Sequence, residues 1–329
     1  MLKPEPDVAP PATADPQFRA DVLAGLARRP RAIPARWFYD HRGSELFEAI
    51  TALPEYYPAR AETAILRRIG PDLAALTGEG CAVVEFGSGS STKTPLVLAA
   101  VAPRAYVPID ISGAFLRESA RSLAAAFPQL PVIPLEADFT APLTLPAAVA
   151  AAPKLGFFPG STIGNLAPAA AVDLLRAMRT SLGADDQRGA QLLIGMDRIK
   201  DAETLIAAYE DAAGVTAAFN LNLLARINRE LAGTVPLDAF QHEARWNDSA
   251  ARIEMHLMAT RAVSFVVAGL PFTFAEGESI HTENSHKYGA RDARLLLRAG
   301  GWTPVREWLD DEGRFAVILA EALPPEPAP

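Results

Sequence analysis

A glycine-rich turn joins an apolar strand to the start of a helix near residue 87. In the segment VVEFGSGSSTKT (83–94), an apolar run leads directly into Gly87, Ser88 and Gly89. Small residues let the backbone approach a ligand closely, and the N-terminus of the following helix presents unpaired N–H groups. The segment indicates a nucleotide-binding turn, although a tight strand-to-helix loop in any α/β domain has the same local pattern.

Two common nucleotide-binding motifs do not fit this turn. The dinucleotide fingerprint GxGxxG has a third glycine at the position where this chain has Thr92. A P-loop needs a glycine directly before its lysine, whereas Thr92 precedes Lys93. The expected ligand is therefore neither bound by a standard dinucleotide turn nor held by a P-loop.

Acidic residues follow three successive strand candidates. Glu85 lies just before the first glycine, Asp110 ends the next strand in AYVPID, and Asp138 follows the third in LEADF. Carboxylates in these places can accept hydrogen bonds from ribose hydroxyls and from an adenine amino group. This combination resembles the S-adenosylmethionine pocket of class I methyltransferases.

Short apolar runs alternate with helical segments from about residue 82 to 198, which predicts a parallel sheet with crossover helices. One such helix should start with Thr94 as its N-cap and Pro95 after it. A closing helix near 290–298 and strands near 305 and 315–319 could complete this sheet. The strand candidates are Ala82 to Phe86, Ala105 to Ile109, Val132 to Leu135, Leu155 to Phe158 and Gln191 to Gly195.

The pattern changes after Asp197, where a helical stretch around 214–231 precedes RIEMHLMATRAVSFVV, which alternates like a long strand or hairpin arm. Both ends of the chain are rich in proline, which predicts disordered tails. We therefore expect an inserted second domain that joins the N-terminal segment. The predicted division is a tail at 1–17, a substrate-binding domain at 18–60 plus 199–286, a methyltransferase domain at 61–198 plus 287–322, and a tail at 323–329.

Composition excludes several classes of protein. The 329 residues carry a formal net charge of -8 and no strong Lys/Arg cluster, so we expect no nucleic-acid partner. One cysteine, Cys81, cannot form an internal disulfide, which indicates a reducing compartment and a small buried residue. Because no apolar stretch reaches about 18 residues and no signal peptide is evident, we expect a cytoplasmic protein without membrane contact.

The five histidines do not form a recognisable metal motif. His281 and Glu283 imitate the HxE of zinc deaminases, but that signature needs paired cysteines. His281 and His286 are expected in a loop, as surface or supporting residues, and no HExxH occurs. We therefore predict no metal site.

Several longer strings match one family more specifically than the glycine turn does. They are RWFYDHRGSELFEAITALPEYYPARAE (36–62), EFGSGSSTKT, FPGSTIGNL, AYEDAAGVTAAFNLNLLARINREL, RIEM and TENSHKY. Together they resemble the EgtD-type histidine Nα-methyltransferases of ergothioneine biosynthesis, a family with fungal relatives that act on other amino acids. The resemblance runs from about residue 20 to 320.

The resemblance implies an α/β protein with a class I, Rossmann-like methyltransferase domain and a second α+β substrate-binding domain. It also implies the cofactor S-adenosylmethionine, no metal, and three methyl transfers to the α-amino group of L-histidine, which give histidine betaine (hercynine). The implied substrate contacts are Tyr56, Asn165, Tyr209, Met255, Glu283 and Ser285. The implied cofactor contacts are Gly87, Lys93, Asp110, Asp138 and Phe139.

The chemistry of these side chains suits separate tasks. Asp110 would hold the ribose hydroxyls, Asp138 with Phe139 would meet the adenine, and Lys93 could pair with the cofactor's carboxylate. Methyl transfer to nitrogen needs a neutral amine held in line with the sulfonium, so positioning should matter more than a strong base. Tyr39, near the amino end of the substrate in the resemblance, is the candidate catalytic residue that orients the amine or relays its proton.

Substrate selection needs partners for two polar ends. Tyr209 and Asn165 can donate hydrogen bonds to a carboxylate, whereas Glu283, Ser285 and Tyr56 can satisfy the two nitrogens of an imidazole. An indole has one N–H donor and would leave part of that site unused. Beside Tyr56, Tyr57 is expected to pack in the core with its hydroxyl at the surface.

Three alternatives remain open at this point. The substrate could be another amino acid, such as tryptophan or a derivative. The chain could be a non-catalytic nucleotide-binding α/β module, or a dehydrogenase with a variant turn. We expect a small-molecule amino acid as the binding partner and a monomer, although no sequence feature sets the oligomeric state.

Overall fold

The computed structural model describes residues 15–89, 91–183 and 189–322. Contacts between Cα atoms divide the chain into two units. Unit 1 consists of Met1–Leu46, Ala213–Ala244 and Met255–Glu283, and unit 2 consists of Phe47–Ala212, Arg245–Glu254 and Asn284–Pro329.

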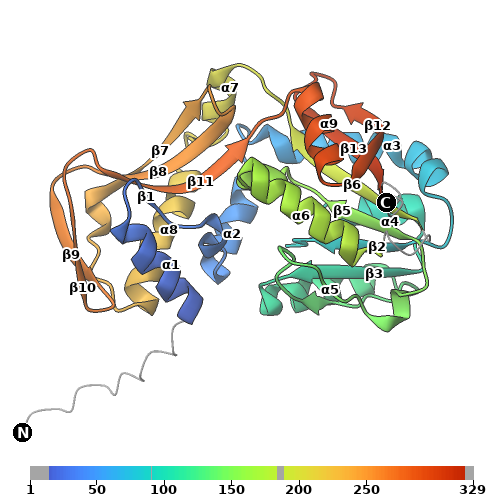
Figure 1. The fold of residues 1–329 in the computed structure, drawn as a ribbon, viewed down its shortest axis with the longest axis horizontal. Coiled ribbons are helices and arrows are strands. Elements are labelled where there is room, and N and C mark those ends of the chain that lie inside the picture. Colours follow the sequence, from blue (N-terminus) through green and yellow to red (C-terminus); the bar gives the residue numbers. More distant parts are fainter. Residues whose placement is uncertain (1–14, 90, 184–188, 323–329) are drawn as a thin grey trace, which may run out of the picture. The chain divides into compact units, whose positions relative to one another are not determined.

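Unit 2 is built on a seven-stranded sheet with the strand order β12-β13-β6-β5-β2-β3-β4 (Figure 1). Strands β2 to β6 pair in parallel, whereas β13 is antiparallel to both of its neighbours. Strands β2 and β5 are buried along their whole length, as expected for parallel strands covered on both faces. The strands are β2 (Ala82–Phe86), β3 (Ala105–Asp110), β4 (Leu135–Glu136), β5 (Lys154–Phe158), β6 (Ala190–Asp197), β12 (Trp302–Leu309) and β13 (Phe315–Ala322).

Helices cover both faces of this sheet. Ile65 of α3 and Val97 of α4 lie in one buried cluster with Val83. Leu175 of α6 and Leu297 of α9 lie in another, which contains the next residue of β2, Val84. Successive residues of a strand point to opposite faces, so the two clusters lie on opposite sides of the sheet. The helices of unit 2 are α3 (Tyr57–Thr77), α4 (Thr94–Val101), α5 (Gly113–Ala126), η2 (Ala147–Val149), η3 (Thr162–Asn165), α6 (Pro168–Ser181), α7 (Ala202–Ala207) and α9 (Ala290–Ala299).

The order of the parallel strands reverses at β2. From β2 the chain continues to β3 and β4 on one side, and then returns to place β5 and β6 on the other. In open α/β sheets, ligands bind outside the carboxyl ends of the strands at such a reversal. The glycine turn at 87–89 follows the carboxyl end of β2 and therefore stands at this point.

Unit 1 combines a mixed sheet with helices. Its four-stranded sheet has the order β1-β11-β8-β7, and β9 pairs with β10 as an antiparallel hairpin. Helix α8 buries Phe219, Leu223 and Ile227, whose spacing places them on one face. The elements are α1 (Pro16–Ala27), β1 (Arg31–Ala32), η1 (Ala35–Phe38), α8 (Val215–Glu230), η5 (Leu237–Ala239), β7 (Phe240–Asn247), β8 (Arg252–Ala259), β9 (Val263–Val267), β10 (Leu270–Phe274) and β11 (Ser279–His286). The chain passes between the units within α2 (His41–Thr51), between Ala212 and Ala213, and within β7, β8 and β11.

The predicted α/β class is confirmed, and the closing helix and two strands do complete the sheet of unit 2. The third strand candidate, Val132 to Leu135, is confirmed in part, because the strand itself is Leu135–Glu136 and Val132 forms an isolated parallel bridge with Tyr106. The loop expected around His281 and His286 is strand β11. Of the predicted tails, 323–329 and residues 1–14 lie outside the described residues, while Pro16 and Gln17 already belong to α1, which Asp15 caps.

The two units do not coincide with the predicted domain limits, since the first break falls after Leu46 and residues 245–254 return to unit 2. Cys81 is buried, as expected. In the ranges that the structure describes, no helix has the length and apolar character needed to cross a membrane.

Candidate active site

The glycine turn takes a backbone conformation that suits glycine. Gly87 and Gly89 have φ values of 71° and 48°, in the region that residues with a side chain rarely adopt. A Cβ atom on Gly87 would lie 3.4 Å from the Phe139 ring. The amides of Gly87 and Ser88 both donate to the Ile109 carbonyl, at 2.9 and 3.1 Å. The turn is thus tied to β3 and leaves room for a ligand to approach its backbone.

The Asp110 carboxylate is fixed at the carboxyl end of β3. Its Oδ2 accepts a hydrogen bond from the Gly89 amide at 3.0 Å, and its Oδ1 accepts one from the Ser112 amide at 2.9 Å. A carboxylate has about four acceptor positions, so it can still accept hydrogen bonds from a ligand's hydroxyl groups. This arrangement fits a ribose beside the glycine turn.

Two aromatic side chains contact the Phe139 ring. Its ring meets Phe86 and Phe158 edge to face, with centroids 6.1 and 6.0 Å away. Asp138, the preceding residue, accepts hydrogen bonds from the amide and hydroxyl of Thr140 at 3.0 and 2.7 Å. The cofactor residues predicted from the sequence therefore lie in one unit, where Asp110 bonds to the glycine turn and the Phe139 ring lies beside Gly87.

Lys93 is not a free cation, because it pairs with Glu62 of α3. The Glu62 carboxylate is fully buried and also accepts a hydrogen bond from the Gly160 amide at 2.9 Å. It lies against Gly195 of β6, where a Cβ atom would come within 2.1 Å of Glu62 Oε1. Sequence reasoning missed Glu62, which binds the segments at both Lys93 and Gly160.

Glu85 is a structural residue, in contrast to its expected place in the ligand pattern. Its Oε2 accepts hydrogen bonds from the hydroxyls of Thr94 and Tyr106, at 2.7 and 2.5 Å. Helix α4 begins at Thr94 itself, so its N-cap is Lys93 instead of the predicted Thr94. Burial raises the pKa of Glu85 to about 7, and these two hydroxyls oppose that rise.

Three of the predicted substrate-binding residues lie in unit 2 and contact one another through a ring pair and a hydrogen bond. The Tyr209 hydroxyl donates to Ser285 Oγ at 2.7 Å, and the ring of Tyr56 lies edge to face with that of Tyr209, 6.2 Å between centroids. Tyr209 and Ser285 are both buried. Lys287, which was not predicted, donates to both hydroxyls at 3.0 and 2.8 Å.

Asn165 ends η3, in the segment FPGSTIGN. The turn before it places Ser161 at a φ of 57°, and the Ser161 hydroxyl accepts a hydrogen bond from the Asp197 amide at 2.9 Å. The Gly164 carbonyl accepts a hydrogen bond from His286 Nδ1 at 2.8 Å. A Cβ atom on Gly164 would lie 2.8 Å from the His286 carbonyl oxygen, so the close approach requires glycine. The segment that carries Asn165 is therefore held against the end of β11.

Tyr57 differs from its expected role. It is buried, and its hydroxyl donates to the Asp197 carboxylate at 2.8 Å instead of reaching the surface. Lys200 lies 2.7 Å from the same carboxylate, and burial lowers the pKa of Lys200 to about 8 despite that attraction. Burial alone would raise the pKa of Asp197, but the charges of Lys287 and Lys200 bring it below its ordinary value.

The remaining predicted residues belong to unit 1. The Tyr39 ring lies edge to face with Phe219 of α8, with centroids 5.8 Å apart. Met255 is buried in β8, and its carbonyl accepts a hydrogen bond from the Thr282 hydroxyl at 3.0 Å. Glu283 is half-buried in β11.

Two histidines of unit 1 stack on each other. The rings of His256 and His281 have centroids 5.0 Å apart. His281 Nε2 donates to the Glu283 carbonyl at 2.9 Å, and His256 Nδ1 lies 3.1 Å from Ser279 Oγ. The first of these bonds ties His281 to the backbone of Glu283, a predicted substrate residue.

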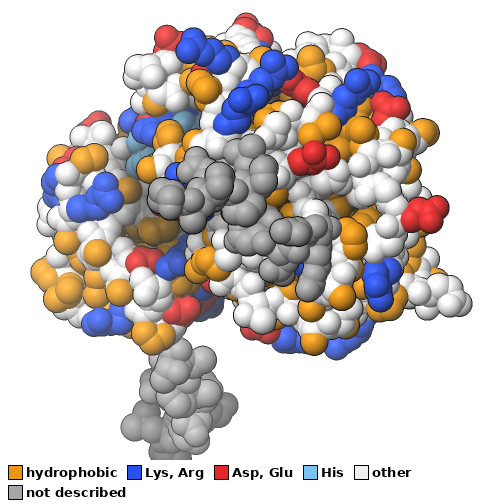
Figure 2. Space-filling model, turned by 45° about the vertical axis from the view of Figure 1, so that its right-hand side comes forward, with side chains coloured by type: hydrophobic (Ala, Val, Ile, Leu, Met, Phe, Trp, Pro, Cys, Tyr) orange, Lys and Arg blue, Asp and Glu red, His pale blue; other side chains and the backbone are white. Residues whose placement is uncertain are grey.

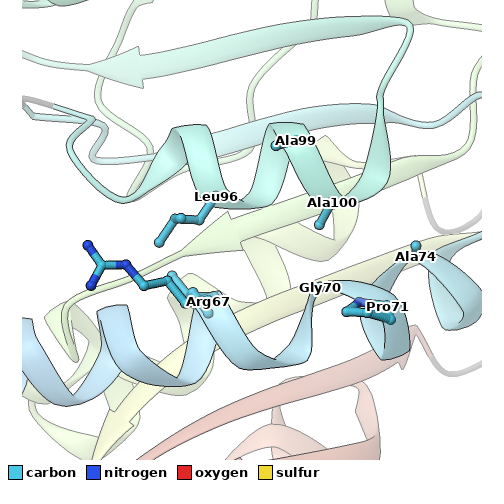
Figure 3. A pocket seen from close by; sticks show the side chains of 8 residues that line it. Arg67, Gly70, Pro71, Ala74, Leu96, Ala99 and Ala100 are labelled. Atoms are coloured by element: carbon cyan, nitrogen blue, oxygen red, sulfur yellow. The ribbon is translucent and has the colours of Figure 1, made fainter.

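The hollow found on the surface of unit 2 is separate from the predicted site residues. A shallow hollow between α3 and α4 is lined by small and apolar residues with one charged side chain, Arg67 (Figure 3). None of the predicted site residues lines it. On the face shown in Figure 2, Lys and Arg side chains are interspersed with acidic and apolar ones.

Comparisons with known proteins find similarity over almost the whole chain. The family model described as "Histidine-specific methyltransferase, SAM-dependent" matches residues 18–322. The chain is 41% identical over 309 residues to the histidine N-alpha-methyltransferase of Mycolicibacterium smegmatis, covering 92% of this chain and 94% of that protein. It is also 41% identical over 310 residues to that of Mycobacterium tuberculosis, with the same coverage. The L-tryptophan methyltransferase trpM of Psilocybe serbica is 27% identical over 348 residues, 93% of each chain.

Proposed function

This chain belongs to the histidine-specific, S-adenosylmethionine-dependent methyltransferases, and we propose that it methylates the α-amino group of L-histidine. The observation that carries the proposal is its 41% identity, over 92% of its length, with a histidine N-alpha-methyltransferase. Family membership makes it an enzyme with a class I methyltransferase domain, in place of a non-catalytic nucleotide-binding module or a dehydrogenase.

The residues around the glycine turn fit the cofactor. Gly87 and Gly89 leave the backbone open, Asp110 offers a fixed carboxylate to a diol, and Phe139 offers an aromatic surface. We assign Asp138 to the adenine and Lys93 to the cofactor's carboxylate, a role in which Glu62 balances the charge of Lys93. When bound, S-adenosylmethionine supplies a methyl group activated by a sulfonium. Because Glu62 neutralises the charge of Lys93, the same pocket can also accept the positively charged sulfur of the cofactor.

The chain's own task is to present a neutral amine. A free α-amino group has a pKa near 8 in model compounds, so losing its proton at pH 7 costs about 1.4 kcal/mol per pH unit. This cost is small beside the gain available from holding the nitrogen in line, which can reach about 7 kcal/mol or more. We assign Tyr39 to orienting the amine or passing on its proton. Asn165 and Tyr209 are assigned to the carboxylate end of the substrate, with Asn165 as the donor there, because the Tyr209 hydroxyl gives its proton to Ser285 Oγ.

The substrate side chain is assigned to a second set of residues. Glu283, Ser285 and Tyr56 would satisfy the two ring nitrogens, with Met255 lining the side-chain pocket. A donor to the second ring nitrogen, beside a carboxylate that accepts the N–H of the first, favours imidazole over rings that lack a second polar atom. The product after three rounds would be histidine betaine, hercynine, for ergothioneine biosynthesis. Cytoplasmic location and the lack of a nucleic-acid partner remain predictions from the sequence, and the monomeric state remains an expectation that no sequence feature supports.

A panel of amino acids incubated with enzyme and S-adenosylmethionine, followed by mass spectrometry, tests this function. We expect histidine to gain three methyl masses. A gain of one or two would retain the methyl transfer and reject trimethylation, and no gain would reject the function.

A second candidate is Nα-methylation of tryptophan, favoured by the 27% identity to the tryptophan enzyme of Psilocybe serbica. The same panel decides between the two substrates. Turnover of tryptophan in preference to histidine would establish this alternative.

A further inference from the structure

Lys287 is a fully buried cation directly after strand β11. Its side chain is 0% exposed, and its Nζ lies 2.8 Å from Asp197 Oδ2, 2.8 Å from Ser285 Oγ and 3.0 Å from the Tyr209 hydroxyl. An ammonium group has three protons and no acceptor. Three acceptors therefore meet three protons, which is the condition under which a buried charge is tolerated.

These contacts determine whether the Ser285 hydroxyl donates or accepts hydrogen bonds. Because lysine can only donate, Ser285 Oγ accepts a hydrogen bond from Lys287, and it accepts a second one from the Tyr209 hydroxyl at 2.7 Å. A hydroxyl has two acceptor lone pairs and one proton. With both lone pairs used, Ser285 can act toward a ligand as a donor alone.

We propose that Lys287 is a positioning and specificity residue that makes the Ser285 hydroxyl an obligate donor to an unprotonated ring nitrogen of the substrate. The proposal rests on the function proposed above, because it takes the substrate side chain to be an imidazole. Neutral imidazole has one such nitrogen, whereas imidazolium has two N–H donors and offers Ser285 no acceptor.

The buried charges around Lys287 also favour a neutral imidazole over an imidazolium. The titratable and charged groups around it and its partners include Asp197 of β6, Lys200, Tyr57 of α3, Tyr56, Tyr209, the neighbouring His286 and Tyr288, and Arg314, whose guanidinium lies 5.2 Å from the centroid of the Tyr57 ring. Asp197 is the one carboxylate in this set, and Tyr57, Lys200 and Lys287 all bind it. With Lys287, Lys200 and Arg314 the set holds three cations beside this one carboxylate, which disfavours a further positive charge on the imidazole.

A double-mutant cycle tests the role of Lys287. Lys287→Met should raise the KM for histidine at least tenfold and leave the Kd for S-adenosylhomocysteine within twofold. Ser285→Ala should have a similar effect on the KM. In the double variant the KM should stay within threefold of the larger single effect, because Lys287 acts through Ser285. Additive losses, or an unchanged KM in Lys287→Met, would overturn the proposal.

Two further variants separate positioning from general support. Lys200→Met removes the neighbouring buried cation, which contacts Asp197 and Tyr57, and it should change the KM less than threefold. Asp197→Asn combined with Lys287→Met removes both members of the buried pair and leaves no unpaired carboxylate. It should reproduce the KM increase of Lys287→Met, and a normal KM in this variant would contradict the proposal.

A measurement on the wild-type protein does not depend on how the variants fold. Histidine labelled with ¹⁵N in the ring, bound together with S-adenosylhomocysteine at pH 6, should show one unprotonated and one protonated nitrogen by NMR. Bound imidazolium at that pH would overturn the proposal even if histidine is methylated. If histidine neither binds nor gains methyl groups, it is the proposed function that fails.

Discussion

The Gly89 amide donates a hydrogen bond to Asp110 Oδ2 across 3.0 Å, although 21 residues separate them along the chain. One acidic side chain thus both shapes the glycine turn of β2 and stands at the end of β3. A ligand that contacts this carboxylate is at the same time held against the turn.

Replacing Asp110 with alanine should abolish most cofactor affinity. Hydrogen bonds to a charged group are worth about 1.5 to 3 kcal/mol each, so losing two to a ribose should raise the Kd at least about 100-fold. Calorimetric titration with S-adenosylhomocysteine measures this effect. Asp173→Ala, an exposed aspartate on α6, is the control and should bind within twofold of wild type. An Asp110→Ala affinity that also stays within twofold would show that the carboxylate does not hold the ligand.

Local patterns in the sequence were enough to predict the core of unit 2. The strand at Ala82–Phe86 was placed correctly, and the glycine turn and Asp110 follow from apolar runs that end in small or acidic residues. Such signals are carried by neighbouring residues, which is why they are readable from one chain.

Contacts between distant residues were not readable in this way. Glu62 and Lys93 are 31 positions apart, and Asp197 and Lys287 are 90 apart, so no spacing indicated either pair. Strand β11, SIHTENSH, was expected as a loop because its polar side chains hide the alternation of a strand. Glu85 was misjudged because a strand-end acid can bind protein hydroxyls as well as a ligand.

Replacing Glu283 with alanine should impair histidine binding selectively. If its carboxylate accepts the imidazole N–H, the affinity for histidine should fall about 100-fold, a loss in the range of a charged hydrogen bond left unmade. Tryptophan affinity should change less than fivefold, which provides the internal control. Calorimetry in the presence of S-adenosylhomocysteine gives both values. Equal losses for the two amino acids would contradict the assignment of Glu283 to the ring.

Replacing Glu62 with alanine should destabilise the fold. The change leaves the Gly160 amide without its acceptor and Lys93 without its counter-charge, which should lower the free energy of unfolding by about 2 to 4 kcal/mol. Glu62→Gln keeps an acceptor oxygen and should lose less. Urea unfolding measures both variants, with the exposed Glu118→Ala as a control expected within about 0.5 kcal/mol of wild type. A Glu62→Ala protein as stable as this control would show that Glu62 does not stabilise the fold.

Replacing Glu85 with glutamine should change how stability depends on pH. Burial raises the pKa of Glu85 to about 7 in the folded protein, from an ordinary value of 4.5. Between these values the folded state holds a proton that the unfolded state has lost, so the free energy of unfolding decreases as the pH rises through this window. The decrease should be on the order of 1 to 3 kcal/mol. Glutamine cannot ionise but keeps an oxygen to accept from Thr94 and Tyr106.

Urea unfolding of wild type and Glu85→Gln at several pH values isolates this contribution, because the other groups titrate alike in both proteins. The stability of wild type relative to the variant should fall between pH 4.5 and 7 and level off above pH 8. Glu85 would then act as a neutral hydrogen-bonded acid at low pH and as a costly buried carboxylate at high pH. Two parallel stability curves would mean that Glu85 keeps an ordinary pKa despite its burial.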